Sequence, residues 1–209
     1  MRTFTKETQD ELTPELALDL LKDGNERFVN NIKAHRNLLQ QVNETSAGQF
    51  PFAAILSCID SRTSAELIFD QGLGDILSIR IAGNILNEDI LGSMEFSCKL
   101  AGSKLIVVLG HTNCGAITGA CNNIVLGNIT GLLNKIKPAI ELETETKTNR
   151  TDTNEAFLRN VTVNNVIITV KKVREQSSIL HEMEETEQIK IVGGLYDVDT
   201  GQVTFFDTI

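Results

Sequence analysis

Two short segments of the sequence carry residue types that could do chemistry together. One is residues 57–62 (SCIDSR) and the other is residues 110–115 (GHTNCG). Cys58, His111 and Cys114 offer two thiolates and one imidazole, a soft ligand set that suits zinc, and three protein ligands leave the fourth tetrahedral position open. The alternative is that Cys58 is a small buried apolar residue and His111 a hydrogen-bonded loop residue, because His-x-x-Cys is a weak motif by itself.

Asp60 and Arg62 are the second chemical feature of the first segment. An aspartate two residues from a thiolate ligand needs a cation to offset the repulsion, and the guanidinium of Arg62 can supply two parallel donors. A carboxylate held in this way stays ionised. Beside a zinc-bound hydroxide it could accept the hydroxide proton in a hydrogen bond and direct the oxygen lone pair at an electrophile. An ordinary salt bridge within a loop is the simpler alternative.

Both segments follow short apolar runs of the kind found in buried parallel strands. Four such runs occur, at residues 52–56, 76–81, 104–109 and 189–192, with helical patterns at 63–70 and 88–101 between the first three. This alternation predicts βαβ units and an α/β fold with a doubly wound, mostly parallel sheet. The carboxyl ends of neighbouring strands in such a sheet converge on one crevice, so we expect Asp60 and His111 to face each other there.

The ends of the chain show further elements. Thr13-Pro14 marks the start of a helix over residues 13–32, with Gly24 as a candidate break. Residues 196–206 predict a hairpin with its turn at residues 199–201. The length of 209 residues fits one domain spanning residues 1–209.

Residues 115–175 predict a largely helical region. Within it, residues 161–173 are rich enough in Val, Thr and Ile to suggest a strand. Asn164-Asn165 inside this run favours a half-exposed helix instead.

The composition excludes several classes of partner. Lys and Arg number 19 and Asp and Glu number 28, for a net charge of −9, and no basic cluster suited to nucleic acid or an anionic membrane occurs. The longest aliphatic run, at residues 105–109, is far too short to span a bilayer, and residues 1–7 have no apolar core of a secretory signal. We therefore expect a cytoplasmic protein, in which four cysteines indicate metal binding or catalysis before disulfides.

Two of the cysteines are predicted to be structural. Cys98 shares a helical face with Ile90 and Met94. Cys121 lies seven residues beyond Cys114, which is ~10 Å along a helix and too far for a shared metal.

Beyond these local patterns, the chain resembles the β-class carbonic anhydrases. Residues 58–62 (CIDSR) and 111–115 (HTNCG) match the two signatures of that family, and residues 80–84 (RIAGN) match the segment between them. Residues 21–28 resemble the N-terminal helix of the family and residues 191–197 its last strands. The resemblance runs from about residue 12 to about residue 206.

The resemblance implies a set of site residues. Zinc would be bound by Cys58, His111 and Cys114, and the pair Asp60 and Arg62 would orient the hydroxide. Gln49 would hydrogen-bond bicarbonate across a subunit boundary, the backbone N–H of Gly115 would donate to the substrate oxygen, and Phe96 falls near an aromatic position of the apolar pocket.

The resemblance also implies fold, assembly and reaction. The fold would be a mostly parallel central sheet with flanking helices, and N-terminal helices would wrap a partner subunit in a homodimer or a dimer of dimers. The reaction would be the zinc-dependent hydration of carbon dioxide to bicarbonate and a proton. Hydrolysis of carbon disulfide or carbonyl sulfide on the same scaffold, and a non-catalytic zinc or redox-sensing protein closed by Cys98 or Cys121, are the alternatives.

One regulatory feature of the family is missing. Some members close the site at lower pH, when the aspartate takes the fourth zinc position, and in one subgroup bicarbonate in a second pocket favours that state. The tryptophan of that pocket corresponds to Ile55, and the chain contains no tryptophan, although Arg80 matches the arginine. We therefore expect the open form, with Asp60 held by Arg62, at neutral pH.

Overall fold

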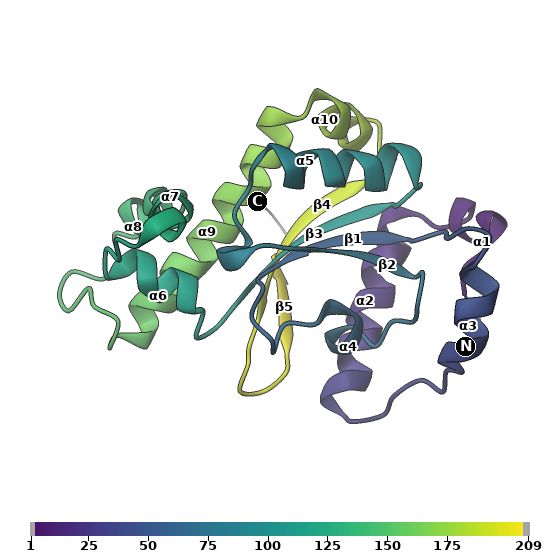
Figure 1. Cartoon of the computed structure of the whole chain (residues 1–209), viewed down its shortest axis with the longest axis horizontal. Coiled ribbons are helices and arrows are strands. Elements are labelled where there is room, and N and C mark those ends of the chain that lie inside the picture. The colour runs from purple at the N-terminus through teal and green to yellow at the C-terminus, as the bar shows by residue number, and fades with distance from the viewer. Residues whose placement is uncertain (1–2, 207–209) are drawn as a thin grey trace.

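A five-stranded sheet forms the centre of the computed structural model, which describes residues 3–206 (Figure 1). The strand order is β2-β1-β3-β4-β5. The first four strands are parallel to their neighbours and β5 is antiparallel to β4. The strands are β1 (Ala53–Ser57), β2 (Ile76–Arg80), β3 (Leu105–His111), β4 (Lys190–Tyr196) and β5 (Val203–Phe206).

Helices connect the strands and cover the sheet. They are α1 (Lys6–Asp10), α2 (Pro14–Val29), α3 (Leu38–Thr45), α4 (Ala65–Ile68), α5 (Glu88–Glu95), α6 (Gly115–Cys121), α7 (Gly127–Asn134), α8 (Lys137–Leu142), α9 (Glu155–Gln176) and α10 (Ser178–Glu185). Short turns of 3-10 helix (Ala82–Asn84) and π-helix (Phe96–Leu100) complete the connections. None of the helices within residues 3–206 is long and apolar enough to cross a membrane.

Helices pack on both faces of the sheet, which confirms the doubly wound α/β fold. Alternate residues of β1 point to opposite faces, because side chains alternate along a strand. Ile55 packs with Leu21 of α2 in one core, and Leu56 packs with Met94 of α5 and Val170 of α9 in the other. Figure 1 shows α6, α7 and α8 grouped at the end of the sheet where β3 leads into α6, with α1 and α3 at the opposite end. The loops that carry the two chemical segments therefore meet at one end of the sheet.

The strand and hairpin predictions are confirmed within one or two residues at most ends. In the β4–β5 turn, a carboxylate oxygen of Asp197 accepts hydrogen bonds from the N–H groups of Asp199 and Thr200, at 2.9 and 3.0 Å. Gly201 has a φ of 78°, a left-handed conformation that glycine adopts without steric cost. These local contacts explain why the turn could be predicted from sequence.

The expected break at Gly24 is wrong, because α2 runs without interruption from Pro14 to Val29. A Cβ atom on Gly24 would lie 1.8 Å from the carbonyl oxygen of Phe69. The glycine therefore allows α2 to approach the segment after α4 and does not end the helix.

The ambiguous run at residues 161–173 is helical and belongs to α9. This confirms the expected half-exposed helix, because buried positions alternate along it with partly exposed ones such as Asn164, and Asn165 lies on the buried face. Its side-chain amide donates to the carbonyl oxygen of Gly83 at 2.8 Å. The helix places this polar side chain in the interior, where it has a specific acceptor.

Candidate metal centre and active site

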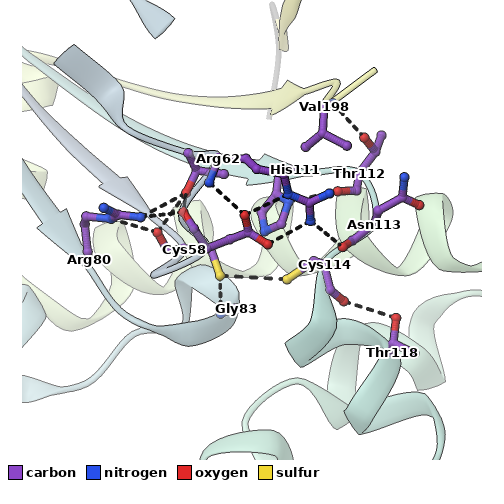
Figure 2. A network of polar contacts seen from close by, with 12 residues as sticks. Cys58, Arg62, Arg80, Gly83, His111, Thr112, Asn113, Cys114, Thr118 and Val198 are labelled. Atoms are coloured by element: carbon purple, nitrogen blue, oxygen red, sulfur yellow. Dashed lines mark hydrogen bonds and ion pairs between the residues drawn. The ribbon is translucent and has the colours of Figure 1, made fainter. Parts of the chain in front are cut away.

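Three side chains from two strand ends form a buried cluster (Figure 2). Cys58 follows β1, His111 is the last residue of β3, and Cys114 precedes the first residue of α6. Because β1 and β3 are adjacent and parallel, their carboxyl ends lie side by side. One ligand atom from each residue lies within 4.8 Å of the other two, and all three residues are buried. The topology thus brings together the three residues predicted as metal ligands.

The imidazole of His111 is prepared to bind a metal. Its Nδ1 lies 2.8 Å from the carbonyl oxygen of Thr112, so Nδ1 carries the proton and donates. Its Nε2 is buried and has no hydrogen-bond partner. A buried nitrogen lone pair without a partner is costly unless another group binds it, and zinc is commonly bound by a histidine whose second nitrogen donates to a carbonyl. The donor set therefore fits zinc.

The two sulfur atoms are 3.9 Å apart. The hydrogen bond from the Cys114 thiol lowers the pKa of the Cys58 thiol, although burial opposes this shift, and the N–H of Gly83 also donates to the Cys58 sulfur at 3.4 Å. The same hydrogen bond and burial raise the pKa of Cys114. Zinc requires thiolates, so its binding would release the proton that the raised pKa keeps on Cys114.

Gly83 has a conformation and a close approach that suit only glycine, and one hydrogen bond holds it in position. Its φ is 68°, and a Cβ atom there would lie 2.9 Å from a methyl group of Ile136. The amide of Asn165 donates to its carbonyl oxygen. Sequence reasoning did not assign Asn165, whose only sequence signal is an asparagine within an apolar helical run.

Asp60 and Arg62 form a bidentate ion pair. Arg62 Nε donates to Asp60 Oδ1 at 2.9 Å and Nη2 donates to Oδ2 at 2.8 Å. The backbone N–H of Arg62 also donates to Oδ1, at 2.9 Å. These hydrogen bonds from Arg62 hold the pKa of Asp60 well below its usual value, against a smaller opposing effect of burial. Arg62 Nη2 donates further to the carbonyl oxygen of Asn113, which ties the pair to the second segment.

Arg80, at the end of β2, contacts the turn that follows β1. Its Nε donates to the carbonyl oxygen of Cys58 at 2.9 Å, and its Nη2 donates to the carbonyl oxygen of Asp60 at 2.6 Å. The buried hydroxyl of Thr63 lies within 2.9 Å of the same two carbonyl oxygens. The family resemblance matches Arg80 to the arginine of a second, bicarbonate-binding pocket. In the structure, its Nε and Nη2 donate to the protein backbone instead.

An apolar pocket of about 600 Å³ opens beside the cluster. Cys58, Asp60 and Gly115 form its polar end. The rest is lined by small and aliphatic residues of the 3-10 turn, α6 and α7, among them Ala82, Gly119, Ile129 and Leu133. Sequence reasoning did not identify the α7 wall, because its residues follow an ordinary helical pattern.

Gln49 and Phe96 do not reach this site within one chain. Gln49 is exposed in the loop before β1 and does not line the pocket. Phe96 is 56% exposed and lines a separate hollow beside β2 with Leu77 and Gly92. Any contact that these two side chains make with the site would have to come from a second copy.

Comparison with known proteins identifies the family. Residues 53–203 match the family model described as carbonic anhydrase. The chain is 36% identical over 204 residues to carbonic anhydrase 2 of Mycobacterium tuberculosis, an alignment that covers 94% of each protein. The chain therefore belongs to the carbonic anhydrase family of enzymes.

Solved structures agree with this assignment at the level of the fold. The β-carbonic anhydrase CafA of Aspergillus fumigatus superposes with a TM-score of 0.73 at 23% identity, covering 92% of this chain and 90% of that one. A structure from a study of two tetrameric β-carbonic anhydrases of Sordaria macrospora superposes with a TM-score of 0.70 at 18% identity, covering 93% and 95%. The α/β sheet described above is thus the β-carbonic anhydrase fold.

Proposed function

We propose that the protein catalyses the reversible hydration of carbon dioxide to bicarbonate and a proton. Cys58, His111 and Cys114 would hold the zinc ion on which this activity depends. The observation that carries the proposal is the buried, unpartnered Nε2 of His111 in a cluster with two cysteine sulfurs, beside a turn that carries an arginine-held carboxylate. A zinc ion in that place lowers the pKa of its water toward neutrality and so supplies the nucleophile.

Asp60 would orient the nucleophile by accepting a hydrogen bond from it. Its Oδ1 accepts two hydrogen bonds from Arg62 and its Oδ2 accepts one, so Oδ2 retains a free lone pair. The lowered pKa keeps the carboxyl ionised near neutral pH, where it can accept a proton in a hydrogen bond but cannot donate one. Arg62 maintains both the charge and the direction of this acceptor.

The pocket walls would bind the substrate and position its oxygen. Carbon dioxide is apolar, and Ala82 and the aliphatic side chains of α7 provide a surface that excludes water. The N–H of Gly115, the first residue of α6, has no acceptor within the helix and can donate to the substrate oxygen. These groups would favour entry of an apolar molecule and would hold it beside the nucleophile that Asp60 orients.

We further propose that the active form is a homo-oligomer, either a dimer or a dimer of dimers, in which N-terminal helices pack on a partner. On α3, the apolar residues Leu38, Leu39 and Val42 are 57%, 72% and 48% exposed, which is costly on an isolated chain. Gln49 follows this helix and would bind bicarbonate at the site of the partner. Tetrameric assembly of the Sordaria macrospora enzymes supports this arrangement.

A cytoplasmic location is the remaining part of the proposal. All four cysteines are free thiols, which fits a reducing compartment.

A stopped-flow hydration assay on zinc-loaded protein tests the proposal. We expect carbon dioxide hydration that is lost when a chelator removes zinc and returns when zinc is restored. Carbon disulfide and carbonyl sulfide should be run beside carbon dioxide, because the apolar pocket would admit all three. Turnover of the sulfur compounds without carbon dioxide hydration would replace the proposed reaction, and zinc binding without any turnover would indicate a non-catalytic zinc protein.

A further inference from the structure

Arg80 is a charged residue that contacts the site and to which the proposed reaction gives no role. Its backbone pairs in register with Ser57, the last residue of β1, so its side chain starts beside the turn that carries Cys58 and Asp60. The guanidinium lies over that turn in Figure 2.

The hydrogen bonds of Arg80 converge on the backbone of that turn. Nε donates to the carbonyl oxygen of Cys58 at 2.9 Å, and Nη2 donates to the carbonyl oxygen of Asp60 at 2.6 Å. Nη2 also donates to the Thr63 hydroxyl at 3.3 Å. The two carbonyl groups belong to a predicted metal ligand and to the predicted orienting carboxylate. One planar group therefore fixes the spacing of both residues.

The turn has little other support on this side. Thr63 donates to the Asp60 carbonyl oxygen through its backbone N–H at 3.0 Å, and its hydroxyl can donate to only one acceptor at a time. The β1 ladder has already ended at Ser57. The carbonyl groups of Cys58 and Asp60 therefore depend largely on side-chain donors for their position.

We propose that Arg80 is a positioning residue of the active site. It clamps the backbone of Cys58 and Asp60, so that the sulfur stays at the metal position and the carboxylate stays aligned with Arg62. This inference rests on the proposed function for its catalytic consequence only. Lysine could not replace Arg80 fully, because an ammonium group lacks the rigid fork that reaches two acceptors together.

The test compares Arg80→Met and Arg80→Lys with a matched control, Ser78→Ala. Ser78 lies two residues earlier on the same strand, and its hydroxyl donates to Glu66 at 2.6 Å, away from the turn. Three quantities are measured: amide hydrogen exchange of residues 58–63, zinc affinity by competition with a chelator, and kcat and KM for carbon dioxide.

In Arg80→Met we expect the Thr63 amide to exchange about tenfold faster, because hydrogen bonds from a charged donor are lost. Zinc affinity should fall by about 10- to 100-fold, the usual effect of removing a group that orients a ligand. The kcat should fall while KM changes little. Arg80→Lys should give intermediate values, and Ser78→Ala should match the parent protein.

Other outcomes would overturn the proposal. Unchanged exchange at residues 58–63 in Arg80→Met would show that no clamp exists. Faster exchange with unchanged zinc affinity and kcat would show that Arg80 only stabilises the turn. If the parent protein binds no zinc or hydrates no carbon dioxide, the proposed function fails, and hydrogen exchange still decides whether the clamp exists.

Discussion

The guanidinium of Arg62 meets the carboxylate of Asp60 edge to edge, with one nitrogen on each oxygen at 2.9 and 2.8 Å. This contact occupies the edge of the carboxylate that faces Arg62. One lone pair of Oδ2 remains available to accept another hydrogen bond. The pair therefore supplies an ionised acceptor in a fixed direction, which is the property that the proposed reaction needs.

Asp60→Asn should retain most of the zinc and lose most of the activity. An amide has nearly the same shape but can present a donor where the carboxylate accepts, so it would turn the nucleophile away from the substrate. We expect kcat to fall by about 10- to 100-fold, as measured by stopped-flow assay with zinc content determined on the same sample. Ser61→Ala, at an exposed neighbouring position, is the control. Near-normal turnover in zinc-replete Asp60→Asn would refute the orienting role.

Serine substitutions at Cys114, Cys121 and Cys98 should differ in their effect on the zinc content of the protein. Cys114→Ser should lose zinc, because it removes one of the three clustered ligand atoms. Cys121→Ser and Cys98→Ser should keep the full zinc stoichiometry, since neither residue belongs to the cluster. Cys98→Ser should also lower the free energy of unfolding by about 1 to 3 kcal/mol, because Cys98 is buried among apolar side chains. Loss of zinc from Cys121→Ser would overturn this division.

Gln49→Ala and Cys114→Ser should complement each other if Gln49 acts on the site of a partner. In a mixed dimer, one site combines the intact ligands of the Gln49→Ala subunit with Gln49 from the Cys114→Ser subunit. Co-expression of the two variants should then restore activity at about a quarter of the sites in a random mixture, although each variant alone is weak. Activity that never exceeds the sum of the separate variants would show that Gln49 does not act on the site of a partner.

Bicarbonate should inhibit the enzyme without cooperativity. Ile55, at the position of the missing tryptophan, is fully buried in the sheet core, and the donors of Arg80 face backbone carbonyl groups. Ile55 therefore offers no donor to an anion, and Nε and Nη2 of Arg80 are already engaged. Measurement of rate against bicarbonate concentration between about pH 7 and 8.5 should give a hyperbolic curve, because the Asp60 carboxyl stays ionised and paired above its lowered pKa. A sigmoidal curve would contradict the prediction.

Asp70→Asn should destabilise the protein in a pH-dependent way. Burial alone would raise the pKa of Asp70, but hydrogen bonds from Arg27, from the N–H of Ala34 and from Arg36 lower it below the ordinary value of 3.8. A carboxyl whose pKa is lower in the folded state stabilises the fold above its unfolded pKa, and this stabilisation is lost as the pH falls through its folded pKa.

The expected cost of Asp70→Asn at pH 7 is about 3 kcal/mol, because it leaves buried arginine charge without its partner. Urea unfolding should show this difference at pH 7 and a progressively smaller one as the pH falls below about 4, the ordinary pKa of the group, toward the lowered folded pKa, below which the carboxyl of the parent protein is also neutral. Asp19→Asn, which removes an exposed ion pair with Lys22, is the control and should change little at either pH. An equal loss at both pH values would show that charge at Asp70 is not the cause.

Most of the sheet could be predicted from local patterns, and the failures share one cause. The apolar runs located β1, β3 and β4 because burial on both faces requires apolar residues at nearly every position, whereas β2, a partly exposed edge strand, was marked by its isoleucines. Gly24 was misread because its role depends on Phe69, which is 45 residues away in the chain. The contact of Asn165 was not foreseen because its acceptor, Gly83, belongs to a different element. Contacts between distant segments leave little trace in a single sequence.

The sequence by itself determined the ligand types, the carboxylate and arginine pair, and the alternation of strands and helices, because each is set by residue identity and near-neighbour spacing. Only the tertiary structure decided that Nε2 of His111 lacks a partner, that Arg80 contacts the backbone beneath Cys58 and Asp60, and that Gln49 lies outside the pocket of its own chain. These features depend on where parallel strands end relative to one another and on which donors reach which acceptors across the sheet. The packing of the whole chain fixes those distances, so residue spacing alone could not predict them.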